Sequence, residues 1–168
     1  LFQPKNLVSR AMFVTMLGRI AERMGIKMEE AKNYIDVNND DYFSPYVGWA
    51  TMVGITSGYS SSVFAPDDPI TREQATAMTA TFADVINRTL PELTDQDRNF
   101  KDEEDIHSWA LEAVEKCANA GILKGYDDNT FQPQTGMNRA EAAQIIQNLC
   151  TVCGIELSDN DENPVAIE

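Results

Sequence analysis

The chain has 168 residues, and its 27 acidic side chains outnumber its 13 basic ones, which gives a net charge of −14. A charge of this sign and size excludes a broad cationic face, so we expect no nucleic-acid binding and no adsorption to anionic lipid. No run of about 18 apolar residues occurs, so we expect no membrane span. The length suits one domain or two small ones with a real core, and we expect any secretion signal to lie outside this sequence.

One ten-residue pattern occurs three times along the chain. Residues 2–11, 64–73 and 131–140 align without gaps, and each copy has Phe first, Pro two positions later and Arg at its ninth position. Self-similarity of this kind is typical of repeat architectures. We therefore treat the chain as a tandem of related units.

Two further motifs mark the complete units. An aromatic-x-Asp motif occurs at 34–36 and at 100–102, and Gly-Ile-x-x-Gly-Tyr follows at 54–59 and at 121–126. The chain starts too late for the first copy to carry either motif. The predicted organisation is the second half of a module (1–26), a complete module (34–88), a polar linker (89–99), a second complete module (100–153) and an acidic tail (154–168).

The repeated pattern encodes a helix start in each copy. Ser9, Thr71 and Asn138 precede the arginines and are good N-cap residues, and Gln74 and Glu141 complete a capping box in the second and third copies. Apolar residues follow each start at helical spacing, which indicates a core-facing stripe.

The glycines of the second motif indicate where the first helix of each complete module ends. Gly54 and Gly121 stand where a left-handed residue would terminate that helix. Gly58 and Gly125 then precede Tyr and free the turn into an extended Phe-x-Pro loop. The predicted fold class is all-α, built from tandem helix–loop–helix modules with short extended segments in the loops.

Aromatic residues are candidates for both the core and a binding surface. Tyr59 and Tyr126, beside the glycine turns, have rings that stack well on sugar faces. Trp49 and Trp109 fit either a groove wall or the core, and both interpretations stay open. Phe64 and Phe131 of the second and third Phe-x-Pro motifs are assigned to the core.

Metal, redox and catalytic chemistry find little support. Cys117, Cys150 and Cys153 are too few and odd in number for a disulfide framework, and the Cys150–Cys153 spacing lacks a full set of zinc ligands. A possible calcium loop at 36–40 lacks the required glycine and bidentate glutamate. With His107 as the single histidine, no Ser-His-Asp set exists. We expect no metal, no cofactor and no catalysis.

Together these motifs resemble the S-layer homology module, whose hallmark is Ile-Thr-Arg-Ala-Glu at the start of its second helix; this chain has Ile-Thr-Arg-Glu at 70–73 and Met-Asn-Arg-Ala-Glu at 137–141. The resemblance covers most of the chain. It implies a pseudo-threefold bundle that anchors secreted bacterial proteins to the cell wall or S-layer. It also implies a noncatalytic module that binds a secondary cell-wall polysaccharide, often pyruvylated, in grooves between modules.

The resemblance also assigns site residues. It matches the family's arginine, its motif hydroxyl and its Asp to positions of this chain, whereas Asn138 and Gln74 depart from the motif. With the glycines and aromatics above, the expected ligand-binding residues are Arg10, Arg72, Arg139, Ser9, Thr71, Asp36, Asp102, Gly58, Gly125, Tyr59, Tyr126 and Trp109.

The arginines have a physical reason to bind an anion. A guanidinium at a helix start lies beside free N–H groups and the positive end of the helix dipole, and it offers a carboxylate two parallel hydrogen bonds. The alternative is that each Arg pairs with a nearby Asp and only ties the modules together. A second functional hypothesis is protein–protein contact or S-layer self-assembly without glycan, with self-association through the incomplete first module.

Overall fold

The computed structural model describes residues 3–28, 34–92 and 99–156. This part of the chain is all-helical, with no strand beyond isolated bridges, which confirms the predicted fold class. Residues 93–98 of the linker and 157–168 of the acidic tail lie outside the described residues. The elements are α1 (Arg10–Arg23), α2 (Ser44–Met52), α3 (Arg72–Val85), the 3₁₀ turn η1 (Glu103–Asp105), α4 (Ser108–Asn119) and α5 (Arg139–Cys153).

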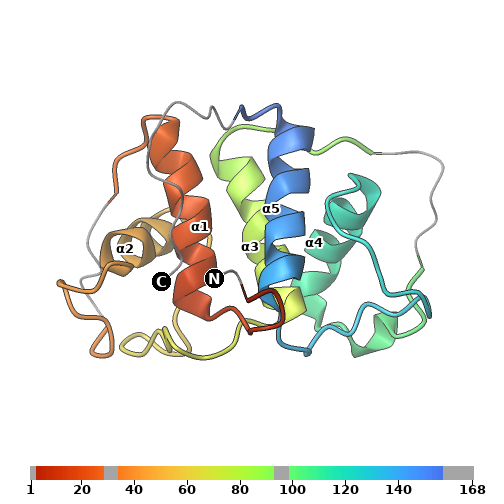
Figure 1. Cartoon of the computed structure of the whole chain (residues 1–168), viewed down its shortest axis with the longest axis horizontal. Helices are drawn as coiled ribbons and strands as arrows, with labels where there is room; N and C mark the ends of the chain where they lie inside the picture. The colour runs from red at the N-terminus through yellow and green to blue at the C-terminus, as the bar shows by residue number, and fades with distance from the viewer. Residues whose placement is uncertain (1–2, 29–33, 93–98, 157–168) are drawn as a thin grey trace.

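Three long helices form the centre of the molecule. Helices α1, α3 and α5 each contact the other two, while α2 packs on α1 and α4 packs on α3 at the two flanks (Figure 1). The first helix of each complete module therefore packs on the second helix of the preceding module. This packing of each module on the preceding one places functional groups of consecutive modules side by side.

A closed ring of three backbone hydrogen bonds joins the copies of the repeated pattern. The N–H of Val8 donates to the carbonyl of Met137, Met137 donates to Ile70, and Ile70 donates to Val8, each at 2.9 Å. These residues occupy equivalent positions just before the three N-caps, and all three are fully buried. The ring gives the bundle its pseudo-threefold arrangement, and its short extended segments lie in the loops as predicted.

The predicted helix starts are confirmed. Thr71 and Asn138 form complete capping boxes with Gln74 and Glu141, whereas Ser9 makes a single cap bond from the N–H of Met12 at 3.3 Å. Because each box satisfies two N–H groups that a helix start otherwise leaves free, α3 and α5 begin firmly at their arginines.

The glycine turns have two different physical causes. Gly54 and Gly121 adopt φ of +79° and +74°, as expected for left-handed helix ends. At Gly58 a Cβ would lie 2.4 Å from the carbonyl oxygen of Val63, and at Gly125 it would lie 2.6 Å from the ring of Phe100. The second glycine of each motif is therefore required by close packing.

The core contains the residues that the pattern assigns to it. Phe64, Phe131 and Trp49 are at most 1% exposed, whereas Trp109 is 57% exposed. All three cysteines are free and buried, and burial raises the pKa of Cys117 to about 12 and that of Cys150 to about 11. They act as small core residues. Among the described helices, none has the length and apolar character needed to cross a membrane.

Candidate functional site

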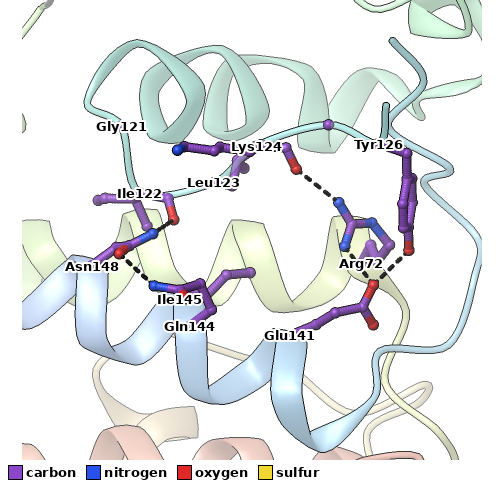
Figure 2. A pocket seen from close by; sticks show the side chains of 11 residues that line it. Arg72, Gly121, Ile122, Leu123, Lys124, Tyr126, Glu141, Gln144, Ile145 and Asn148 are labelled. Carbon is purple, nitrogen blue, oxygen red and sulfur yellow. Dashed lines mark hydrogen bonds and ion pairs between the residues drawn. The ribbon is translucent and has the colours of Figure 1, made fainter. Parts of the chain in front are cut away.

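A cavity of about 440 Å³ lies at the boundary between the two complete modules. Its walls are the loop from Gly121 to Tyr126, the exposed side of α5 and, at one end, Arg72 of α3 (Figure 2). Arg72, Tyr126 and Glu141 converge at that end, and the amides of Gln144 and Asn148 lie toward the other. The cavity combines a charged end with a row of neutral hydrogen-bonding groups.

Arg72 crosses the boundary between modules. Its Nε donates to the carbonyl oxygen of Phe131 at 2.7 Å, its Nη2 donates to that of Lys124 at 3.2 Å, and its Nη1 pairs with Oε1 of Glu141 at 3.2 Å. The guanidinium also lies over the ring of Tyr126, 4.6 Å from its centroid. Every one of these partners belongs to the following module, so Arg72 is a buried inter-module contact.

Arg10 repeats this arrangement one module earlier. Its Nε donates to the carbonyl oxygen of Phe64 and its Nη2 to that of Ser57, both at 3.0 Å, and its guanidinium lies 4.5 Å from the ring centroid of Tyr59. Burial lowers the pKa of Arg10, and the nearby Tyr59 and Asp68 oppose that shift. The sequence equivalence of Arg10 and Arg72 therefore extends to their surroundings.

Among the described residues, Arg139 has no set of partners comparable to those of Arg10 and Arg72. Its Nε is buried and makes no hydrogen bond within the part of the chain that the structure describes. The repeated pattern pairs each preceding arginine with a loop of the next module, and for Arg139 no described loop supplies those acceptors. We therefore base the site on Arg10 and Arg72.

The two motif aspartates hold the Phe-x-Pro loops. Asp36 accepts hydrogen bonds from the N–H groups of Phe64 and Ala65 at 2.9 and 2.7 Å, and Asp102 accepts equivalent bonds from Phe131 and Gln132 at 2.7 Å. Burial raises the pKa of the Asp36 carboxyl, but these N–H groups outweigh it and the net pKa is lowered. The carboxylate partner of Arg72 is thus Glu141, not an Asp as the alternative interpretation required.

The remaining expected residues fall into two groups. Gly125 and Tyr126 line the cavity; burial and a 2.6 Å hydrogen bond from the Tyr126 hydroxyl to Glu141 raise the pKa of Tyr126. Ser9, Thr71 and Trp109 do not line it: the two hydroxyls cap helices, and Trp109 stacks on His107. Tyr59 is 56% exposed beside Arg10, and Gly58 donates its N–H to the hydroxyl of Tyr34.

Several cavity residues were not predicted from the sequence. Gln144 donates to Asn148, and Asn148 donates to the carbonyl oxygen of Ile122, both at 2.9 Å. With Glu141 they form a polar stripe along one face of α5 at helical spacing, which is the signal that could have identified them. Lys124 lines the same cavity.

A second cavity of about 440 Å³ lies between α1 and α5. Met16, Ile20 and Ile146 give it an apolar floor, and Arg19 and Arg23 form its α1 edge. Its position is equivalent to the places where α2 packs on α1 and α4 packs on α3, but no described helix fills it. This surface, which we call the α1/α5 groove, has the character of a helix-binding face.

Comparisons with known proteins agree with the repeat organisation. The chain is 30% identical over 149 residues to an endoglucanase of Bacillus sp. (strain KSM-635), 29% over 150 residues to a cellulosome-anchoring protein of Acetivibrio thermocellus, and 24% over 147 residues to a surface-layer 125 kDa protein of Lysinibacillus sphaericus. These alignments cover 88%, 87% and 86% of this chain but only 15%, 32% and 12% of the relatives. The similarity thus concerns a part that proteins with different names share.

The family assignment follows from the modules themselves. The model of the S-layer homology domain matches residues 33–76 and 99–143, which together make up more than half of the chain. Each matched stretch contains one aromatic-x-Asp motif, one glycine turn and the start of one long helix. The chain therefore belongs to the S-layer homology domain family.

Proposed function

We propose that this chain is a noncatalytic anchoring module of a secreted protein and attaches it to the bacterial cell wall or S-layer by binding a secondary cell-wall polysaccharide. The observation that carries the proposal is the cavity at the module boundary, where Arg72, Tyr126 and the polar face of α5 meet. The names of relatives, a cellulosome-anchoring protein and a surface-layer protein, support the location.

The chemistry of the cavity suits an acidic sugar chain. A guanidinium fixed by backbone carbonyls costs little further ordering when a ligand arrives, and a tyrosine ring beside it offers an apolar face to a sugar ring. Gln144 and Asn148 present amides that match sugar hydroxyls. A volume of about 440 Å³ falls within the range of about 300–1,000 Å³ that is typical of small-ligand sites. We propose an anionic, pyruvylated polysaccharide as the ligand.

Binding to isolated cell walls tests this proposal. We expect the chain to sediment with native wall sacculi and to remain in solution with sacculi stripped of the secondary polymer. Equal retention on both preparations would contradict polysaccharide binding.

A pair of variants on one helix locates the site. Gln144→Ala removes an amide from the cavity and should weaken wall binding severalfold, while the thermal midpoint stays unchanged because the side chain is exposed. Gln147→Ala is the matched control, since Gln147 lies on the same helix but lines the α1/α5 groove. If Gln147→Ala weakened binding more than Gln144→Ala, the cavity would not be the site.

We propose self-association as a second candidate function, favoured by the α1/α5 groove. An apolar floor edged by Arg19 and Arg23 fits an acidic amphipathic segment, and a second copy of this acidic chain is the occupant we propose. Sedimentation at several concentrations should then show a dimer that Ile146→Glu abolishes. A strict monomer at every concentration would contradict self-association.

A further inference from the structure

The α1/α5 groove lies at the point where the chain leaves its last helix. Helices α1 and α5 run in the same direction, because the segments that precede them pair at one end of the bundle (Figure 1). Just after the left-handed Gly154 that ends α5, Ile155 lines the groove. Residues 157–168, which we call the tail segment, therefore start two positions after a residue of the groove.

The groove changes character along its length. Arg23 lies in the last turn of α1 and Arg19 one turn earlier, so the end of the groove near Ile155 is cationic. Within the described part of the chain, neither arginine forms an ion pair. Met16 and Ile146 lie closer to the starts of the two helices and make that part of the groove apolar. A ligand that matches the groove therefore has acidic groups at one end and apolar groups at the other.

The tail segment carries these groups in the matching order. Asp159, Asp161 and Glu162 come first, Val165 and Ile167 follow, and no basic residue occurs from position 157 to position 168. A segment that enters the groove from the end of α5 meets the two arginines before it meets the apolar floor. Opposite charges then lie together at the cationic end, and two aliphatic side chains are removed from water at the other.

The dimensions of the groove permit this match. The groove follows α5 from Ala143 to Cys150, which is about 10 Å at a rise of about 1.5 Å per residue. The chain from Ile155 to Val165 spans up to about 33 Å when it is extended. A site tied to its ligand by a short linker sees that ligand at a concentration on the order of millimolar. Even a weak contact therefore lets the tail segment occupy the groove in preference to a second chain in dilute solution.

We propose that the tail segment binds the α1/α5 groove of its own chain, with its acidic side chains on Arg19 and Arg23 and with Val165 and Ile167 on the apolar floor. The segment then competes with the second copy of the chain that the proposed self-association places in the same groove. This competition rests on that proposed function, whereas the binding of the segment itself does not.

Charge reversal of the segment in the 168-residue chain tests its binding. The lysine variant combines Asp159→Lys, Asp161→Lys and Glu162→Lys. It should release the segment, because lysines face the two arginines with like charge. Methyl NMR on monomeric protein should then show different signals for Met16 and Ile146 in the variant and in the wild type. Met52, which is exposed on α2 outside the groove, should keep its signal. Identical Met16 and Ile146 signals in the two proteins would overturn the proposal.

Charge exchange identifies the partners of the segment. Adding Arg19→Glu and Arg23→Glu to the lysine variant should return the Met16 and Ile146 signals toward their wild-type values, because opposite charges face each other again. Signals that stay at their lysine-variant values in a folded protein would overturn the pairing. A synthetic peptide of residues 157–168 covers the case in which this variant folds poorly: added to the lysine variant, it should restore the wild-type signals, and a peptide with the three lysines should not. Failure of the wild-type peptide would also overturn the pairing.

Sedimentation at several concentrations tests the competition. The lysine variant should dimerise about tenfold more tightly than the wild type, because a competitor at high local concentration is removed. The matched control combines Asp40→Lys, Asp67→Lys and Glu104→Lys at exposed positions, which changes the net charge equally. Equal dimerisation of the lysine variant and this control would overturn the competition. If all three proteins stay monomeric, the proposed self-association fails, and the NMR comparison alone decides whether the segment binds the groove.

Discussion

Phe64 is held from both sides by residues that the sequence places far away from it. Its N–H donates to Asp36, and its carbonyl oxygen accepts from Nε of Arg10. Phe131 is held in the same way by Asp102 and Arg72. Each motif aspartate thus fixes the carbonyl that orients an arginine, and its effect on binding is expected to pass through that loop.

Asp36→Asn should destabilise the protein in a pH-dependent way. The carboxyl has a lowered pKa in the folded state, so its stabilisation is fully present above the unfolded pKa of 3.8 and is lost as the pH falls through the folded value. We expect a loss of about 1–3 kcal/mol at pH 7 that shrinks below about pH 4. Urea unfolding at both pH values measures it. Asp40→Asn, at an exposed position nearby, is the control, and an equal pH-dependent loss there would contradict the role of Asp36.

The arginines and tyrosines of the site could be predicted from the sequence, but the partner of Arg72 could not. Glu141 is fully explained by its capping box when the sequence is considered alone. Its second oxygen reaches Arg72 only because the two modules pack so that the start of α5 lies beside Arg72 of α3. This packing between modules is not determined by local helix propensity.

At the scale of the elements, the helix starts followed directly from the repeated pattern because capping is a local interaction. The repeated pattern did not predict which helices pack together. Helix α4 packs on α3 of the preceding module, and Cys117 of α4 lies against the carbonyl of Thr76 in α3. A module defined by its sequence motifs therefore buries the apolar face of its first helix against the neighbouring module, not within itself.

The glycine turns allow a prediction about one element. Gly58→Ala should destabilise the protein by about 1–3 kcal/mol, because the added methyl would meet two backbone carbonyl oxygens that cannot easily move. Gly136→Ala is the matched control: its nearest neighbour, at 3.3 Å, is the end of the Leu7 side chain, which is 52% exposed. Thermal unfolding of both variants measures the difference. Equal losses would show that close packing is not the reason for Gly58.

At the scale of the whole molecule, the ring formed by Val8, Ile70 and Met137 links all three copies of the pattern. The first N–H group of each long helix also donates a hydrogen bond to the loop of another copy, as when Arg10 donates to the carbonyl of Asp68 and Arg72 donates to that of Thr135. The positions of Arg10 and Arg72 are therefore properties of the complete bundle. The repeated local motif accounts for each arginine, but only the closed ring accounts for their common geometry.

The net charge of −14 gives a prediction for binding to an acidic polymer. Protein and polymer repel each other over long range, so in the proposed function the attraction comes from the local donors of the cavity at the module boundary. Salt shortens the Debye length from about 10 Å at 0.1 M to about 3 Å at 1 M, and it screens the exposed charges more than the buried arginine. Affinity should therefore persist or rise as salt increases.

Calorimetry over a salt series measures this dependence, with the polymer that lacks its carboxylates as the control. Affinity for that neutral polymer should vary little with salt, because no long-range repulsion is there to be screened. A steep loss of affinity for the acidic polymer would mean that many exposed cations make the contact instead. Such a result would conflict with the proposed site, in which a few local donors of one cavity recognise the polymer.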